Sequence, residues 1–277
     1  LETGKPDSAL AEKLADELCD ALVKGGAHLD SYHLPISVSG KLTGGDYEIP
    51  HDVSSQYISG LMFALPLLSS DSRIVLDGIP ESNPYIRMTR SALRQFGINT
   101  EDDGRFGFYI KGRQRYSSCG NVFVEGDWSN AAFWLCCGAI GNHQVSVRGL
   151  DMDSAQGDRR IVDILKDFGA DVSVSDTEIT VNPSKLHAVQ LDAKDIPDLV
   201  PVISVVASVA SGDTRIYNAS RLRLKESDRI KSTAKMLRSL GAQVKELEDG
   251  LVIKGGTLKG GTVDTFNDHR IAMAASV

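Results

Sequence analysis

The sequence predicts a soluble α/β protein built from a repeated unit of about 72 residues. Three observations support this: amphipathic helices that end at evenly spaced glycines, short alternating runs after each glycine, and a second kind of helix that is apolar on nearly every side. A helix that connects two strands favours parallel pairing, whereas a hairpin adds antiparallel strands. One unit is therefore expected to run strand, helix, strand, helix, strand, strand.

The amphipathic helices carry apolar residues at helical spacing, as Ile161, Ile164 and Leu165 illustrate. Each is expected to end at one of four glycines spaced 71, 72 and 72 residues apart: Gly26, Gly97, Gly169 and Gly241. Glycine adopts the left-handed conformation that closes a helix at no steric cost. Two alternating runs follow each glycine, for example at 171–174 and 178–181, and their polar connections predict a β-hairpin.

The second kind of helix is represented by SSQYISGLMFALPLL, SNAAFWLCCGAI and DLVPVISVVASVA. Because these segments are apolar nearly all round, we expect them to be buried. Each is followed by a run with strand character, at 73–76, 144–147 and 214–217. A solenoid is one interpretation of such a repeat, but buried helices within each unit favour closed globular domains.

The repeat is expected to be truncated at both ends of the chain. The first residues lie within a helix of one unit, and the last, Val277, lies a few residues into an apolar helix that begins at Asp268. Fully burying one aliphatic side chain is worth roughly 1.5–3 kcal/mol. We therefore expect this chain to be less stable than a version extended at its C-terminus, or to associate through this region.

Composition narrows the classes of partner. A net charge of −7 argues against nucleic acid and anionic membranes, both of which favour a basic surface. The longest apolar runs, 61–68 and 199–210, are too short to span a bilayer. The sequence shows no signal peptide, and its four cysteines match neither a zinc site nor a disulfide framework. We expect a cytoplasmic protein.

Each apolar helix begins with polar residues, at 52–56, 127–130, 195–198 and 267–270. Helix capping by Ser, Asp and Asn explains any one of these starts. At the first of them, however, Ser54, Ser55 and Gln56 add hydroxyls and an amide beside free backbone N–H groups. Such a helix start favours a phosphate or a carboxylate as ligand.

Two helix starts also carry cations. His269 and Arg270 lie at one of them, and Arg159 and Arg160 lie at another. The start of a helix already carries partial positive charge, so an arginine there costs stability unless an anion is bound. We interpret both pairs as pointing to anionic ligands.

The densest charged cluster occupies 221–229. Lys225 and Arg229 are four residues apart and share one face of a helix, with Glu226 beside them. A solvated helix start is the usual meaning of such a run. Because the later part of this helix has an apolar face, we favour a functional interpretation of the cluster.

These polar motifs resemble those of one family, the EPSP synthases. The matching motifs occur in the family's order: Gly-Asp-Tyr-Glu-Ile-Pro, Asp-Val-Ser-Ser-Gln-Tyr, Ser-Asn-Pro-Tyr, Val-Glu-Gly-Asp-Trp-Ser, Gln-Gly-Asp-Arg, Asp-Ile-Pro-Asp, Leu-Lys-Glu-Ser-Asp-Arg and Asn-Asp-His-Arg. The resemblance runs from about Leu34 to the last residue. It implies two domains, each with three βαβαββ units around a pseudo-threefold axis (an inverted α/β barrel), and substrates bound between them. Residues 1–124 would be part of the shikimate-phosphate-binding domain, and 125–277 part of the second, phosphoenolpyruvate-binding domain.

The resemblance also implies a reaction. The family transfers the enolpyruvyl group of phosphoenolpyruvate to the 5-hydroxyl of shikimate 3-phosphate and releases phosphate, in the shikimate pathway to the aromatic amino acids. It implies no metal or organic cofactor, and a monomer when the protein is full length. The implied acceptor site holds the phosphate on Ser54, Ser55 and Ser82, with Gln56 and Tyr85 towards the shikimate ring. The implied catalytic residues are Asp198, Glu226 and Lys225.

Within this set, Asp198 would hold ring hydroxyls and act as base, and Glu226 would take part in proton transfer at the methylene carbon. Lys225, Arg229 and Arg270 would hold phosphoenolpyruvate, and His269 would complete the substrate-binding set. The types suit the chemistry, because the methylene carbon needs an acid, the hydroxyl needs a base, and two anionic substrates need cations.

The chain also departs from the family pattern. A Lys- and Arg-bearing segment near the N-terminus and a C-terminal lysine region are missing, and Lys13-Leu14 stands near the place of an Arg-Pro pair. We therefore expect near-background activity from this chain alone. The alternative is a catalytically incomplete fragment that binds shikimate 3-phosphate or needs a complementing chain. A UDP-N-acetylglucosamine enolpyruvyl transferase is a further alternative, but Ser-Ser-Gln and Ser-Asn-Pro-Tyr favour the shikimate acceptor.

Overall fold

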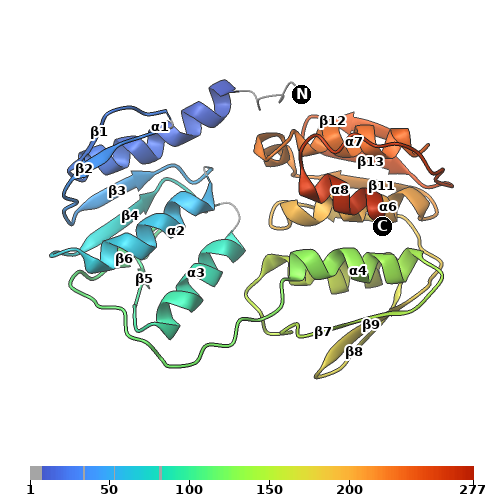
Figure 1. Ribbon diagram of the computed structural model, residues 1–277, viewed down its shortest axis with the longest axis horizontal. Helices are drawn as coiled ribbons and strands as arrows, with labels where there is room; N and C mark the ends of the chain where they lie inside the picture. Colours follow the sequence, from blue (N-terminus) through green and yellow to red (C-terminus); the bar gives the residue numbers. More distant parts are fainter. Residues whose placement is uncertain (1–7, 34, 53, 81–82) are drawn as a thin grey trace. The chain divides into compact units, whose positions relative to one another are not determined.

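The computed structural model describes residues 8–277 apart from 34, 53 and 81–82. The chain divides into two compact units, a first unit that ends at Phe123 and a second that runs from Val124 to Val277 (Figure 1). Each unit packs its helices against its own sheets and has its own apolar core. None of the described helices is long and apolar enough to cross a membrane.

The first unit contains a small hairpin and a four-stranded sheet. Its described helices are α1 (Ser8–Lys24), α2 (Ser55–Ala64), a short 3₁₀ turn (Leu65–Leu67) and α3 (Asn83–Gln95). Its strands are β1 (Ala27–Leu29), β2 (Val38–Gly40), β3 (Asp46–Ile49), β4 (Ser72–Leu76), β5 (Glu101–Asp102) and β6 (Phe108–Ile110). The sheet order is β3-β4-β6-β5, and β3 and β4 are parallel whereas β6 is antiparallel to both of its neighbours.

The second unit contains two sheets. One has the order β7-β9-β8, and the other has the order β10-β11-β13-β12 with β10 and β11 parallel. Its strands are β7 (Val145–Arg148), β8 (Asp171–Val174), β9 (Glu178–Asn182), β10 (Gln190–Asp192), β11 (Asp213–Tyr217), β12 (Gln243–Leu247) and β13 (Gly250–Lys254). Its helices are α4 (Trp128–Ile140), α5 (Ile161–Asp167), α6 (Val200–Val209), α7 (Arg229–Ser239) and α8 (His269–Ser276). Three 3₁₀ turns precede helices: η2 (Gly157–Arg160), η3 (Pro197–Leu199) and η4 (Ser220–Leu224).

Helix α6 lies at the centre of the second unit. Residues 200–208 are all buried, and the helix packs against α4, α7, α8 and strand β13. The expectation of burial holds less well for the other apolar helices, because Phe63 of α2 is 48% exposed and Trp134 of α4 is 65% exposed. Uniform apolar composition therefore indicates a core helix only in α6.

The expected order of elements is confirmed twice. It is β3-α2-β4-α3-β5-β6 in the first unit and β10-α6-β11-α7-β12-β13 in the second. The expected inverted α/β barrel is not confirmed, because none of the sheets formed by the described strands closes on itself. Each of these sheets keeps two edge strands, and helices cover its face instead.

The four spaced glycines close helices as expected. Gly26, Gly97, Gly169 and Gly241 have φ values of 104°, 78°, 90° and 90°. An L-residue with a side chain pays a steric penalty in this conformation because its Cβ approaches the following carbonyl oxygen. The glycines therefore allow the chain to turn from each helix into the hairpin strand that follows.

Gly241 gives a clean test of this conformational requirement, because a Cβ added there would meet nothing closer than a Lys259 side-chain carbon at 3.7 Å. We expect Gly241→Ala to lower the free energy of unfolding of the second unit by about 1–2 kcal/mol. Gly256→Ala is the matched control, since it lies in open space without a positive φ. Urea unfolding measures both, and equal effects of the two variants would contradict this explanation.

Candidate functional site

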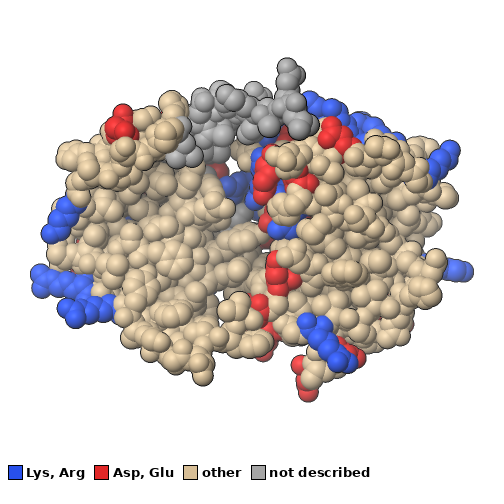
Figure 2. Space-filling view, in the orientation of Figure 1, with Lys and Arg blue, Asp and Glu red and all other residues tan. Residues whose placement is uncertain are grey.

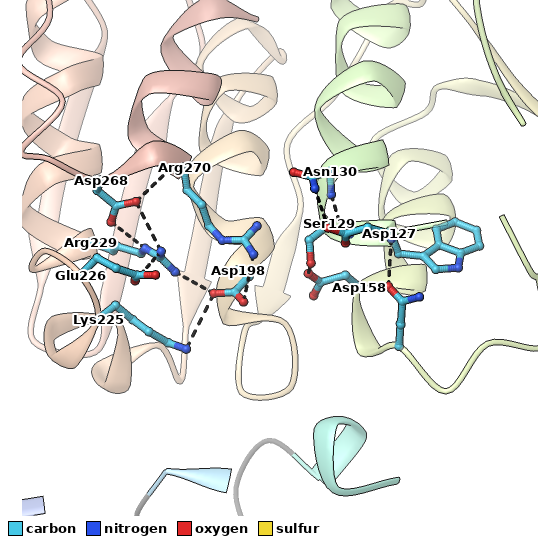
Figure 3. A network of polar contacts seen from close by, with 12 residues as sticks. Asp127, Ser129, Asn130, Asp158, Asp198, Lys225, Glu226, Arg229, Asp268 and Arg270 are labelled. Carbon is cyan, nitrogen blue, oxygen red and sulfur yellow. Dashed lines mark hydrogen bonds and ion pairs between the residues drawn. The ribbon is translucent and has the colours of Figure 1, made fainter. Parts of the chain in front are cut away.

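A cluster of charged side chains joins three helix starts in the second unit. Asp198 comes from η3, Lys225 and Glu226 precede α7, Arg229 is the first residue of α7, and Asp268 and Arg270 flank the start of α8 (Figure 3). Figure 2 shows acidic and basic side chains intermixed over part of this unit. Such mixing indicates that opposite charges pair locally.

Arg229 is the buried centre of this cluster. Its side chain is 1% exposed, and its guanidinium donates to Asp268 at 2.8 Å, to Asp198 at 2.7 Å and to Glu226 at 2.6 Å. Burial alone would lower the pKa of Arg229, but the three carboxylates outweigh it and raise that pKa. Arg229 therefore stays charged and ties α7 to η3 and α8.

Asp268 is the N-cap of α8 and is also fully buried. Its carboxylate accepts from Arg270 N at 2.9 Å, from the Ser227 hydroxyl at 3.0 Å and from Arg229. Burial acts to raise the pKa of Asp268, but these donors, with Arg229 foremost, hold it below its usual range. One side chain thus caps a helix and balances a buried cation.

Asp198 faces three cations. Its carboxylate oxygens lie 2.7 Å from Arg229 Nη1, 3.3 Å from Arg270 Nη2 and 3.8 Å from Lys225 Nζ. Lys225 is 33% exposed and Arg270 13%, so these two cations are more accessible than Arg229. Arg270 Nη1 has no hydrogen-bond partner among the described residues. This nitrogen is itself buried, so it is a donor whose hydrogen-bonding capacity is left unsatisfied within the described residues.

A second polar site lies at the start of α4. Asp127 caps this helix by accepting from Ser129 N at 2.9 Å, and the Ser129 hydroxyl bonds to the carboxyl group of Asp158 in η2. Asp158 is 3% exposed, and burial raises its pKa to about 6 even though the Ser129 hydrogen bond acts to lower it. Gln156 holds the neighbouring loop by bonding Trp128 N and Gly126 O.

The first unit carries the other residues expected from sequence. Ser54 caps α2 by accepting from Gln56 N at 3.3 Å, Ser55 is buried in the first turn, and Gln56 is exposed. Tyr85 lies in the first turn of α3 and is half-buried. Ser59 and Thr89 join α2 to α3 through a 2.7 Å hydrogen bond. Ser82 lies outside the described residues.

The structure thus brings together Asp198, Lys225, Glu226, Arg229 and Arg270. His269 is exposed and does not hydrogen-bond within this cluster, as far as the structure describes it. The anion-site interpretation of Arg159 and Arg160 stays a prediction. Both are exposed because η2 intervenes before α5, and the acid between them and Gly157, Asp158, is buried instead.

Sequence reasoning missed Asp158, Ser129 and Asp268. Ser129 and Asp268 stand in polar helix starts whose capping residues gave a sufficient local explanation. Among the described residues, no group of His, Cys, Asp and Glu is placed to hold a metal ion.

Comparison with known proteins supports the resemblance. The family model of EPSP synthase (3-phosphoshikimate 1-carboxyvinyltransferase) matches residues 8–277. A 3-phosphoshikimate 1-carboxyvinyltransferase from Clostridium kluyveri is 48% identical over 246 residues, which are 88% of this chain and 57% of that protein. The chain belongs to the EPSP synthase family.

Two further members of the EPSP synthase family agree with this assignment. A 3-phosphoshikimate 1-carboxyvinyltransferase from Methanocorpusculum labreanum is 42% identical over 276 residues, which are 98% of this chain and 64% of that protein. A solved EPSP synthase from Acinetobacter baumannii matches with a TM-score of 0.74 at 26% identity, covering 94% of this chain and 63% of that one. The α/β fold class is therefore shared, and the chain spans less than two thirds of the length of each relative.

The buried pair of Asp268 and Arg229 makes a stability prediction. Asp268→Asn keeps the shape but removes the charge, so we expect a loss on the order of 3 kcal/mol, typical when one partner of a buried ion pair is removed. Glu246→Gln is the matched control, because Glu246 pairs with Arg238 at the other, exposed end of α7 and such pairs are worth about 0–1 kcal/mol. Denaturant unfolding measures both.

The same pair makes a pH prediction. Because the folded-state pKa of Asp268 is lowered, its contribution is fully present above the unfolded value of about 3.9 and is lost as pH falls through the folded value. The difference between wild type and Asp268→Asn should therefore shrink only in acid. A difference that is constant down to the lowest pH at which the unit folds would show that Asp268 acts as an uncharged cap.

Proposed function

We propose that this chain carries the acceptor and donor sites of an enolpyruvyl transfer from phosphoenolpyruvate to the 5-hydroxyl of shikimate 3-phosphate, with release of phosphate. Family membership supports the reaction, and the observation that carries it is the gathering of Lys225, Arg229 and Arg270 around Asp198. Neither a metal ion nor an organic cofactor has a role in this proposal. We assign the donor to residues 125–277 and the acceptor phosphate to residues 1–124, and the pseudo-threefold arrangement of the units is part of the same proposal.

The assignment of the donor site rests on which cationic N–H groups are not already used in hydrogen bonds within the protein. Phosphoenolpyruvate carries a carboxylate and a phosphate, so it needs several cationic donors. Arg229 uses four of its five N–H groups on Asp268, Asp198 and Glu226, which leaves mainly a positioning role and one N–H on Nη1. Arg270 and Lys225 are more accessible, and they are the first contacts of the donor in this proposal.

Proton transfer is the second requirement of the reaction. The methylene carbon of the donor must accept a proton before its neighbouring carbon becomes electrophilic, and the acceptor hydroxyl must lose one. We assign the role of base to Asp198, whose carboxylate oxygens lie against Arg229, Arg270 and Lys225. Glu226 is half exposed beside Lys225, and it exchanges the methylene proton.

The acceptor phosphate is assigned to the start of α2. Ser54 caps this helix by accepting from Gln56 N, Ser55 follows in the first turn and is 8% exposed, and the partial positive charge of a helix start favours an anion. Gln56 is exposed and Tyr85 is half-buried at the start of the adjacent α3, so both are placed to contact the remainder of the acceptor. Ser82 and His269 complete the assignment from the family resemblance alone.

Glu226 gives the sharpest kinetic test. In a version of the protein extended to the length of its relatives, we expect Glu226→Gln to lower kcat by about 10²–10⁴, the usual worth of a general acid–base group, while shikimate 3-phosphate binding changes little. Glu248→Gln is the control, because Glu248 is exposed in the turn before β13. Phosphate release from both substrates measures kcat. Wild-type turnover of Glu226→Gln would reduce Glu226 to the ion-pair partner of Arg229.

Ser55 tests the acceptor site. A hydrogen bond to a charged group is worth about 1.5–3 kcal/mol, so Ser55→Ala should weaken shikimate 3-phosphate binding by about tenfold to a hundredfold. Ser70→Ala, an exposed serine of the same unit, is the control. Calorimetric titration measures both affinities, and an unchanged affinity in Ser55→Ala would contradict the assignment. Binding of the acceptor without any phosphate release would instead support the incomplete-fragment alternative.

A further inference from the structure

Asp158 is a buried acid that the proposed reaction does not use. It lies in η2, is 3% exposed, and bonds through Oδ2 to the Ser129 hydroxyl at the start of α4. Its other oxygen, Oδ1, has no hydrogen-bond partner among the described residues. A buried carboxylate oxygen without a donor is costly, whereas the protonated group loses much less on burial.

The charges that face Asp158 come from three neighbouring elements. Asp127 caps α4, Asp198 belongs to η3 and Arg270 belongs to α8 (Figure 3), and the charges of all three act on the pKa of Asp158. On its own turn, Arg159 and Arg160 are exposed. Two acids and one base therefore face Asp158, and two of these three residues are in the proposed donor site.

The positive and negative charges of the cluster around Asp198 already balance without Asp158. Lys225, Arg229 and Arg270 supply three positive charges, and Asp198, Glu226 and Asp268 supply three negative ones. An ionised Asp158 adds a fourth negative charge close to Asp198 and Arg270. A bound anion adds further negative charge to the same cluster, so an ionised Asp158 disfavours anion binding and a bound anion disfavours the ionised form of Asp158.

We propose that Asp158 takes up a proton when an anion binds to the Lys225–Arg229–Arg270 site, so that anion affinity is controlled by the protonation of this one buried carboxyl group. The inference rests on the proposed function for the place of the anion. The proton comes from solvent and is released when the anion leaves, and no covalent bond changes. Arg270 carries the coupling, because its charge acts to lower the pKa of Asp158 and its buried Nη1 has no hydrogen-bond partner among the described residues.

The direction of the pH effect follows from the position of the group. Without a ligand, the pKa of Asp158 is raised to about 6, and burial is the largest cause. The carboxyl group is therefore neutral below that pH and ionised above it. Anion affinity is therefore highest in mild acid and falls as pH rises through this range. By linkage, a bound anion raises the pKa of Asp158. The free energy of this shift equals the difference in anion binding free energy between the protonated and the ionised forms of Asp158.

Sulfate is the best probe, since it remains a dianion from about pH 5 to about pH 8, whereas a phosphate monoester titrates near pH 6. Carbon-detected NMR of the Asp158 carboxyl group in the wild-type chain, with and without saturating sulfate, measures its midpoint directly. We expect the midpoint to rise when sulfate is bound. A midpoint that does not move while sulfate shifts the Arg270 signals would overturn the inference and leave the anion site intact.

Asp158→Asn provides the reciprocal test. In the wild type we expect sulfate affinity to fall about fivefold or more between about pH 5 and about pH 7.5, the lower end of ordinary coupling between sites, and in Asp158→Asn we expect it to stay level. Asp163→Asn, an exposed acid on α5, should behave as the wild type. The same pH dependence in Asp158→Asn would overturn the inference. If sulfate and phosphoenolpyruvate fail to perturb Arg270 at any pH in any variant, the proposed donor site and the inference both fall.

Discussion

The burial of one charged side chain, Arg229, organises the second unit. A buried guanidinium must be surrounded by acceptors, and here Asp198, Glu226 and Asp268 supply them from three segments that are far apart in sequence. Two of these acceptors have a further role, because Asp268 caps α8 and Asp198 also contacts Lys225 and Arg270. The geometry of the candidate site is thus a consequence of balancing this one charge. Well-packed apolar residues can serve stability as well as a buried ion pair does, so stability alone does not account for the charges at these positions.

The repeat explains why the acceptors meet. Two apolar helices of this unit begin with acids of the cluster: Asp198 lies in η3 before α6, and Asp268 precedes α8. Both starts lie beside the start of α7, because α6 packs against both α7 and α8. Backbone N–H groups at such starts favour anions. Carboxylates occupy these positions in the protein itself, and the proposed substrates compete with them for Arg270 and Lys225. Glycines such as Gly241, with φ of 90°, let each unit return its hairpin to the sheet and so keep the helix starts together.

Local patterns predicted the elements well because their causes are local. Apolar spacing, the glycine at a helix end and the alternation of a hairpin each depend on a few adjacent residues, and the strands predicted at 171–174 and 178–181 are found at 171–174 and 178–182. The site was only partly predictable. The charged run that contains Lys225, Glu226 and Arg229 was visible, but the pairing of Arg229 with Asp268 joins residues 39 positions apart. Asp158 was hidden because the 3₁₀ turn that buries it and exposes Arg159 is decided by tertiary packing.

The central claim is that accessible cations around Asp198 bind the anionic donor. An NMR titration of the arginine side-chain N–H signals with phosphoenolpyruvate tests it most directly. The account predicts that the Arg270 signals shift in a saturable manner, while those of Arg113, which bonds to Ser69 O in the first unit, stay unchanged. Saturable binding of phosphoenolpyruvate that leaves the Arg270 signals in place would contradict the account.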